Sequence, residues 1–288
     1  MGPGSITQIA GERISVRAYD AKRSVHPQLR ARLREVVAEN CVGPLGNRVR
    51  IELIDVDELA TSEARSLGTY GIITGARLYL VAAIEDTVSA RVDVGYCLEK
   101  IILEATRLGL GTCWMGGTFR RANFARNVGV RDGEIIPVVT PVGYARKQKS
   151  LRERVMRRLA GSDQRKPWES MFFLGNRNTP LPRGGRFDAA LACLRLAPSA
   201  SNKQPWRIIE QSDAECFDFH LKRTPHYNEL MRGIDLQMVD MGIAMCHFDL
   251  ATAEAGCKGE FSIRSPAPSL GDAEYIASWQ TQPNSGVE

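Results

Sequence analysis

Arginine and serine side chains alternate with apolar ones near the start of the chain. If this stretch is extended, Arg13, Ser15 and Arg17 lie on one side, because successive side chains of an extended chain point to opposite faces. Ile14 and Val16 are then expected to face the core. Two guanidinium groups beside a hydroxyl suit a phosphate or an anionic ring, since arginine offers paired donors and stays charged. An exposed edge strand with charges against aggregation fits the same pattern, and the spacing leaves both interpretations open.

A loop in the second half of the chain combines small residues with two amide side chains. Pro198, Ser199 and Ala200 allow a ligand to approach the backbone closely. Asn202 and Gln204 carry amides that both donate and accept hydrogen bonds, as a heteroaromatic ring with alternating N–H and C=O groups would require. An ordinary loop between a helix and a strand, with the asparagine in a left-handed conformation, accounts for the same residues. The chemistry alone leaves both open.

A glycine-rich turn, Gly-Leu-Gly-Thr-Cys-Trp-Met-Gly-Gly at residues 109–117, follows a long expected helix. Its glycines allow backbone amides to approach a ligand, and Trp114 and Met115 offer flat or polarisable cover. The turn is not the dinucleotide fingerprint of a Rossmann fold, because it follows a helix and does not open one. By itself it is a weak indication of a site.

Other common catalytic and metal-binding patterns are missing. The four histidines are scattered without the spacing of a metal site, and His247, which has apolar neighbours in a helix, is expected to be a packed side chain. No GxSxG nucleophile elbow occurs. The seven cysteines include no CxxC pair, so we expect free thiols in a reducing, cytoplasmic compartment.

The formal net charge is +5, and the densest basic run lies at residues 146–158. No aromatic residues interleave this run, so stacking on nucleic-acid bases is not indicated. It is interpreted as a solvated basic helix or as a positive wall for an anionic cofactor or substrate. The chain starts without a signal-peptide pattern, and no apolar run approaches the roughly 18 residues that span a bilayer. Neither a membrane nor a nucleic acid is an expected partner.

The candidate segments need a scaffold that mixes helices and strands. Apolar residues recur at helical spacing in some stretches and alternate, or run continuously, in others. The expected helices are 22–40, 91–108, 149–160, 186–196 and 235–255. The expected strands are 49–54, 78–83, 134–143, 206–211, 217–222 and 275–279.

The order of these elements repeats once. Val92-Asp93-Val94-Gly95 begins one long helix, and Val239-Asp240-Met241-Gly242 begins another. The first helix ends before Gly109 and the second before Gly256. The two beginnings and the two ends are each 147 residues apart, a period that indicates a duplicated domain and not a solenoid.

The two halves join through a segment of loop composition. Residues 161–185 hold several glycines and prolines. The same stretch contains Trp168 and Phe172, so we expect it to pack along the body of the protein. The predicted division is a first half at residues 1–160, this connecting segment, and a shorter second half at residues 186–288.

The three candidate segments resemble motifs of the nitroreductase family. Residues 13–19 look like its N-terminal R-x-S-x-[RK]-x-[FY] motif, residues 198–206 like P-S-[SA]-x-N-x-Q-P-W, and residues 108–117 like its GLGTCW turn. Pro141-Val142-Gly143-Tyr144 and Arg165-Lys166-Pro167-Trp168-Glu169 look like two later elements of the family. The resemblance spans most of the chain.

One departure from the family pattern is informative. In ordinary members the first two motifs lie close together, and two subunits build each FMN site. Here the second motif is displaced to residues 198–206, and a degenerate stretch, Val-Gly-Pro-Leu-Gly-Asn at residues 42–47, takes its place. The resemblance implies an α+β, nitroreductase-like fold, with two related α/β halves in one chain forming a pseudo-dimer. One flavin site would be complete and the other lost. Such a pseudo-dimer favours a monomer, with a homodimer left open.

The resemblance also assigns roles to residues of the first half. Arg13, Ser15 and Arg17 would hold the phosphate, the ribityl chain and the pyrimidine edge of FMN. Met115 and Gly116 would present their backbone near N5 of the flavin, the atom that accepts and donates hydride.

Residues of the second half would complete the same site. The isoalloxazine ring would be lined by Pro198, Ser199, Ala200, Asn202 and Gln204. Arg165 or Lys149 would add a contact to the phosphate. No side chain is expected as an obligatory acid or base, because the flavin performs the chemistry and the protein orients and tunes it.

The function implied is that of an FMN-dependent oxidoreductase. NADH or NADPH would reduce the FMN by hydride transfer, and a small electron acceptor such as a nitroaromatic or a quinone would then take the electrons. A catalytically silent protein that binds or sequesters flavin is one alternative. A basic nucleic-acid-binding protein is another.

Overall fold

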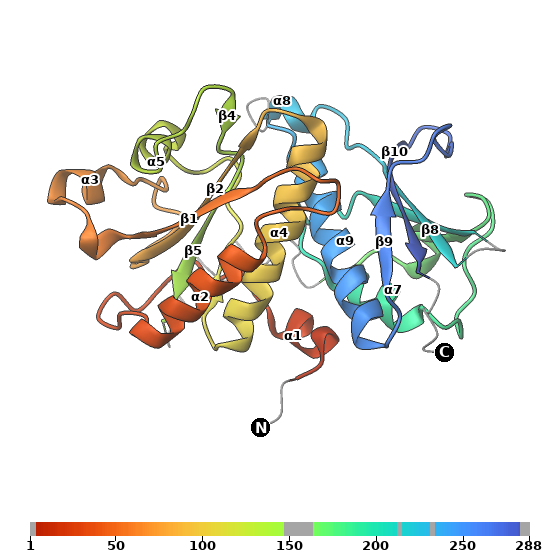
Figure 1. Ribbon diagram of the computed structural model, residues 1–288, viewed down its shortest axis with the longest axis horizontal. Coiled ribbons are helices and arrows are strands. Elements are labelled where there is room, and N and C mark those ends of the chain that lie inside the picture. Colours follow the sequence, from red (N-terminus) through yellow and green to blue (C-terminus); the bar gives the residue numbers. More distant parts are fainter. Residues whose placement is uncertain (1–3, 147–163, 212–214, 231–233, 283–288) are drawn as a thin grey trace, which may run out of the picture.

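Two long helices lie side by side in the middle of the molecule, and a five-stranded sheet flanks each of them (Figure 1). The helices are α4 (Val88–Arg107) and α9 (Leu236–Glu254). One sheet comes from the first half of the chain and the other from the second, which confirms the predicted α+β class with two related halves. The computed structural model describes residues 4–146, 164–211, 215–230 and 234–282.

The first sheet is antiparallel throughout. Its strands are β1 (Arg50–Asp55), β2 (Leu78–Glu85), β3 (Gly111–Thr112), β4 (Glu134–Ile135) and β5 (Val139–Gly143). Their order is β1–β2–β5–β3, with β4 paired to the end of β2. The continuous apolar run predicted as a central strand is β2, which is buried at every position except the last. The single strand expected at 134–143 is two strands, because Pro137 lies between them and lacks the N–H that a ladder needs.

The second sheet mixes one parallel pair with antiparallel pairs. In spatial order its strands are β6 (Phe172–Leu174), β7 (Trp206–Gln211), β8 (Cys216–Leu221), β10 (Glu274–Thr281) and β9 (Gly259–Ser262). The edge strand β6 comes from the predicted connecting segment and runs parallel to β7. Part of that segment is therefore built into the second sheet, and its Trp168 and Phe172 are buried.

The two central helices begin and end in the same way. Thr87 caps the start of α4 and Asp235 the start of α9, each through a side-chain oxygen that accepts a backbone N–H three residues on. Each helix ends before a glycine with positive φ, Gly109 at +74° and Gly256 at +77°. Glycine adopts this conformation without the penalty that a Cβ imposes, so these glycines terminate the helices as predicted.

One glycine on each central helix lets the two backbones touch. A Cβ on Gly95 would collide with the carbonyl group of Val239, and a Cβ on Gly242 would collide with that of Val92. The two contacts are related by the same offset of 147 residues, so the helix crossing is itself symmetric. The repeated V-D-x-G pattern thus marks the surface where the two halves pack.

The N-terminal helix crosses from one half to the other. This helix, α1 (Ile6–Glu12), packs against α7 (Asp188–Leu196) as well as against α4 and α9. Its first backbone N–H donates to the carboxylate of Glu254 at 3.0 Å. The residues that follow α1 therefore start at the junction of the two halves. The remaining described helices are α2 (Pro27–Glu39), α3 (Thr61–Ser66), α5 (Arg121–Asn127), α8 (Tyr227–Leu230) and the 3₁₀ turns η1 (Val56–Glu58), η2 (Trp168–Ser170) and η3 (Ala200–Asn202).

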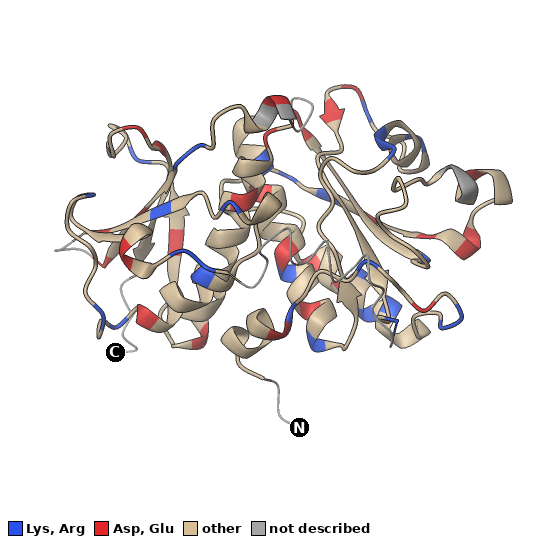
Figure 2. Cartoon of the chain, turned by 180° about the vertical axis from the view of Figure 1, so that it is seen from behind, with Lys and Arg blue, Asp and Glu red and all other residues tan. Residues whose placement is uncertain are grey.

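Charges of both signs are interspersed over both halves in the view of Figure 2. The basic run at 146–158 and the helix expected at 149–160 lie, apart from Arg146, outside the described residues. Among the helices that are described, none combines the length and the apolar character needed to span a bilayer. All seven cysteines are free thiols.

Candidate flavin site

A cavity of about 450 Å³ lies between the two halves. This volume is in the range of small-molecule and cofactor sites. The first half contributes Arg13, Ser15, Arg17, Trp114, Met115, Gly116, Gly117, Thr118 and Val138 to its wall. The second half and the segment before it contribute Arg165, Pro198, Ser199, Ala200, Ser201, Asn202, Tyr227, Leu236, Val239, Asp240 and Ile243. All three segments singled out in the sequence meet here, although they are distant along the chain.

The N-terminal segment is extended, as predicted, and lies beside the turn after α4. Ser15 forms a parallel bridge with Thr112, and the N–H of Val16 donates to the Thr112 carbonyl at 2.8 Å. Val16 is buried, but the expectation that Ile14 also faces the core is wrong, because its side chain is 37% exposed. Strict alternation fails here because the segment joins the sheet only through isolated bridges.

Two arginines of this segment present guanidinium groups to the cavity. Arg13 is almost buried, yet its Nε and Nη1 atoms have no hydrogen-bond partner among the described residues. Glu99 Oε1 lies 3.9 Å from the Arg13 Nε. The side chain of Arg17 makes no hydrogen bond or ion pair within the described part of the chain. Two guanidinium-bearing residues at one wall of a cavity suit an anionic ligand, because arginine stays charged and offers paired donors.

The second-half loop is held in a left-handed turn. Ser201 and Asn202 have φ of +50° and +52°, and Asp240 on α9 accepts a hydrogen bond from the Ala200 N–H at 2.8 Å. The asparagine therefore has the conformation of an ordinary loop and also lines the cavity. Gln204 does not line it.

The buried amide of Gln204 supports the loop from behind. Its Oε1 accepts from the Lys166 N–H at 2.8 Å, and its Nε2 donates to the carbonyl oxygen of Asn202 at 3.2 Å. The prediction that Gln204 lines the isoalloxazine is corrected on this point. Burial, and then the nearby cations Arg207, Lys203 and Lys222, lower the pKa of Lys166 to about 8.

The glycine-rich turn forms the first-half side of the cavity. Both backbone polar groups of Met115 are bonded to Val139, at 3.0 and 2.9 Å, so its N–H cannot serve a ligand. The carbonyl of Gly116 accepts from Arg121 at 2.7 Å, whereas its N–H donates to no described residue. Of the two residues predicted to offer a backbone N–H to a flavin, Gly116 alone has this group available. Met115 still lines the cavity.

The two candidate phosphate contacts have different outcomes. Arg165 lines the cavity and is anchored by a hydrogen bond from Nη2 to the Leu196 carbonyl at 3.0 Å. Lys149 lies outside the described residues.

Several wall residues had no role in the sequence-based prediction. Tyr227 donates from its hydroxyl to Ser201 Oγ at 3.0 Å, and burial raises the pKa of this phenol. Asp240 has one oxygen, Oδ2, without a partner among the described residues, and burial raises its pKa well above the ordinary value. The V-D-x-G repeat contains Asp240, but the repeat indicated only duplication.

The first half holds the corresponding aspartate differently. Both oxygens of Asp93 accept hydrogen bonds, from the N–H of Leu45 at 2.9 Å and from the N–H and side-chain amide of Asn47 at 2.9 and 2.7 Å. This loop is the degenerate copy of the second motif, and it is tied down onto its helix. Gly43 packs so closely on Asp93 that any Cβ would collide with it. Hydrogen bonds within the protein therefore use both carboxylate oxygens of Asp93, whereas Oδ2 of Asp240 has no such partner among the described residues.

The sequence matches the family described as "Putative TM nitroreductase" over residues 5–252. The chain belongs to this nitroreductase family. No curated protein matches it in sequence. The membership identifies an oxidoreductase family, in agreement with the resemblance seen in the motifs.

One solved structure shows the nitroreductase fold over nearly the whole chain. A "putative nitroreductase" from Thermotoga maritima is 20% identical, with a TM-score of 0.58, and the match covers 98% of this chain and 94% of that one. A nitroreductase family protein from Clostridium difficile is 20% identical and covers 53% of this chain and 91% of its own, with a TM-score of 0.41. An FMN-dependent nitroreductase from the same species is 16% identical and covers 49% and 88%, with a TM-score of 0.40.

Proposed function

We propose that the chain binds one FMN in the cavity between its halves and uses it to pass electrons from NADH or NADPH to a small acceptor. The observation that carries the proposal is the cofactor-sized cavity between the halves, whose wall brings Arg13, Ser15 and Asn202 together from segments far apart in the sequence. Arg17 and Arg165 line the same cavity, so its wall is cationic. Family membership and the three motifs support a flavin as the anionic ligand.

Different residues of the cavity wall would bind different parts of FMN. Arg13, Ser15 and Arg17 would hold the phosphate, ribityl chain and pyrimidine edge, because they offer charged and hydroxyl donors on one face of the segment. Gly116 would present its N–H to the flavin ring, and Leu236 packs against this glycine so closely that a Cβ would collide with it. Pro198, Ser199, Ala200 and Asn202 would cover the ring from the second half.

The chemistry that FMN supplies when bound is reversible two-electron transfer, from the hydride of NADH or NADPH to an electron-poor acceptor such as a nitroaromatic or a quinone. The protein's part is to bind, to orient and to keep the ring accessible on one side. We expect the proton that accompanies reduction of the acceptor to come from solvent, since no described wall residue is required as an acid.

The first experiment is the visible spectrum of the purified protein, with chromatography of the released cofactor. We expect flavin absorption bands and FMN in the extract. Arg17→Ala removes a charged hydrogen-bond donor, which is worth about 1.5–3 kcal/mol, so FMN affinity should fall roughly 10- to 100-fold in a fluorescence titration. Arg177→Ala is the matched control, because Arg177 is half-exposed, pairs with Asp272 and does not line the cavity.

The outcomes separate the candidate functions. Bleaching of the flavin by NADH or NADPH, followed by recovery on adding a nitroaromatic or a quinone, is expected of the oxidoreductase. A protein that holds FMN but is not bleached by either nucleotide would be a silent flavin binder. A colourless protein that takes up no added FMN would contradict the flavin site altogether and leave nucleic-acid binding to be tested.

A further inference from the structure

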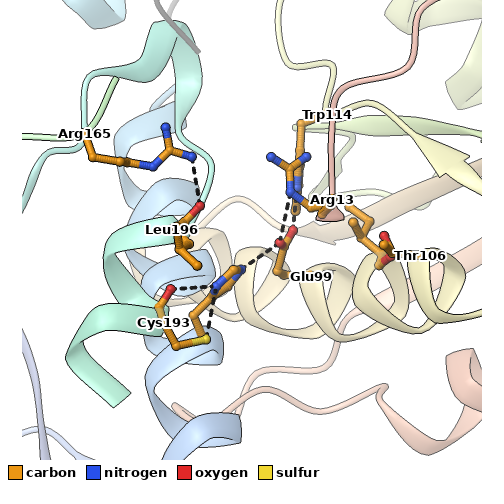
Figure 3. A network of polar contacts seen from close by, with 9 residues as sticks. Arg13, Glu99, Thr106, Trp114, Arg165, Cys193 and Leu196 are labelled. Atoms are coloured by element: carbon orange, nitrogen blue, oxygen red, sulfur yellow. Dashed lines mark hydrogen bonds and ion pairs between the residues drawn. The ribbon is translucent and has the colours of Figure 1, made fainter. Parts of the chain in front are cut away.

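A buried glutamate directly behind the cavity wall connects two wall residues to the opposite half. Glu99 on α4 is fully buried, and its Oε2 accepts the indole N–H of Trp114 at 2.7 Å. Its Oε1 lies 2.9 Å from Nε2 of His247 on α9 and 3.9 Å from Nε of Arg13. Figure 3 shows Arg13 and Trp114 converging on Glu99 from one side and a histidine-to-glutamate contact on the other, and both Arg13 and Trp114 line the cavity. One carboxylate thus links the first-half wall to the central helix of the second half.

The partners of His247 determine where its protons lie. Nδ1 lies 3.1 Å from the carbonyl oxygen of Cys193 on α7, and a carbonyl can only accept. Nδ1 therefore carries a proton. Nε2 faces the carboxylate of Glu99, which accepts when ionised, so the arrangement suits an imidazolium that donates from both nitrogens.

The charge state agrees with this geometry. Burial by itself lowers the pKa of His247. The contact with the Cys193 side chain, whose Sγ lies 3.8 Å from Nδ1, together with the hydrogen bond to Glu99 and the charge of Glu99, outweighs it and raises the pKa to about 9. The imidazolium is then present at neutral pH.

The neighbouring titratable groups do not replace His247 as a partner of Glu99. The Cys246 thiol on α9 has a pKa raised well above its ordinary value by burial, so it stays neutral. Lys100 and Asp249 both contact Tyr96, through the ring face and the hydroxyl respectively. Within the described part of the chain, Arg13 is the other charged group within 4 Å of Glu99.

We propose that the Glu99–His247 pair positions Arg13 and Trp114 in the cavity wall and sets the charge of that wall, which would in turn set the reduction potential of a flavin bound in the cavity. When His247 is charged, it neutralises the negative charge of Glu99. The positive charge of Arg13 then acts on the cavity in full. Without that charge, Glu99 would neutralise Arg13. Positive charge near a flavin favours its electron-rich reduced form, so both residues act through Arg13 as positioning residues. The inference rests on the proposed FMN site.

The test measures the reduction potential of the bound flavin in three variants. His247→Gln keeps a donor for Glu99 but removes the charge. We expect it to shift the two-electron equilibrium at least tenfold toward oxidised flavin, a fall of about 30 mV. Glu99→Gln removes the opposite charge, so its potential should equal or exceed that of the wild type.

The double variant, Glu99→Gln with His247→Gln, restores the wild-type net charge, and its potential should return toward the wild-type value. Mere loosening of the core would instead add the two effects. His220→Gln is the control, because His220 is an equally buried histidine on β8 that does not line the cavity. Its potential should be that of the wild type. An unchanged potential in His247→Gln, or single variants that both lower it, would overturn the proposal.

A second measurement does not need the flavin. In ¹⁵N spectra of the flavin-free wild type, both ring nitrogens of His247 should be protonated at pH 7, and Glu99→Gln should abolish this. A neutral His247 ring at pH 7 would overturn the proposal even if the variants fail to fold. If the wild type takes up no FMN, the proposed function fails, while these spectra still report on the pair. If the wild type binds FMN but the reduction potentials of the variants differ from those expected, the role of the Glu99–His247 pair is contradicted and the proposed function is not.

Discussion

Gly242→Ala is expected to lower the free energy of unfolding by about 3 kcal/mol, in the upper range for overpacking of a core. The added Cβ would overlap the carbonyl group of Val92 and crowd the N–H of Tyr96. These are backbone atoms of a long helix, so they cannot move away singly as a side chain can. The gain in helix propensity, about 1 kcal/mol for replacing glycine by alanine, offsets only part of this cost. Denaturant titration followed by circular dichroism measures the change.

The matched control for this prediction is Gly11→Ala in α1. A Cβ on Gly11 meets no atom within 4 Å, so this substitution is expected to leave stability unchanged or to raise it slightly. Gly95→Ala should behave like Gly242→Ala, since its Cβ would meet the Val239 backbone. Equal stabilities of Gly242→Ala and Gly11→Ala would show that the helix crossing does not depend on these close contacts.

The two related aspartates should respond in opposite directions to the same substitution. Asp93→Asn places an N–H₂ group opposite the donors of Asn47, so we expect a loss of about 3 kcal/mol from the hydrogen bonds to this carboxylate. Asp240→Asn keeps an acceptor for Ala200 and removes a buried carboxyl whose second oxygen has no partner among the described residues. Its stability at neutral pH should therefore rise in the flavin-free protein.

The raised pKa of Asp240 predicts how the stability of the wild type depends on pH and how Asp240→Asn changes that dependence. Burial raises the pKa of Asp240 in the folded state, so the folded protein holds a proton that the unfolded chain has released. Stability then falls as the pH rises above about 4, the ordinary pKa of aspartic acid. Thermal unfolding between pH 4 and 7 should show that Asp240→Asn loses this part of the slope. A stabilising Asp93→Asn, or a destabilising Asp240→Asn in the absence of flavin, would contradict the assignment.

The parts of the fold that follow from local pattern were predictable. The two central helices and the strand at 206–211 agree closely with their expected ranges, because long apolar periodicity and terminal glycines are local signals. The short helix α1 carried no such signal: it has seven residues, and tertiary contacts to α7 and α9 support it. The break in the strand expected at 134–143 was not predicted, because the apolar residues on both sides of Pro137 suggested one continuous strand.

The site was predictable only as far as its motifs reach. Motif spacing selected residues that the fold brings to one cavity, but it could not tell a lining amide from a supporting one, and so Gln204 was misplaced. It also could not show that the amide of Met115 is bonded to Val139, a contact made through tertiary packing. The Glu99–His247 pair was not predicted, because its members are 148 residues apart and each resembles an isolated polar residue in an apolar helix.

The Glu99–His247 pair also has a meaning for how such a chain evolves. At the same 147-residue offset, the counterpart of Glu99 is Cys246 and that of His247 is Lys100. In a homodimer every substitution occurs twice, so a glutamate acquired at the position of Glu99 would also appear at the position of Cys246 on the other side of the interface. Gene fusion removes that constraint. Each half can then change independently, and an interface that began as two equal sides can acquire an acid on one side and a base on the other.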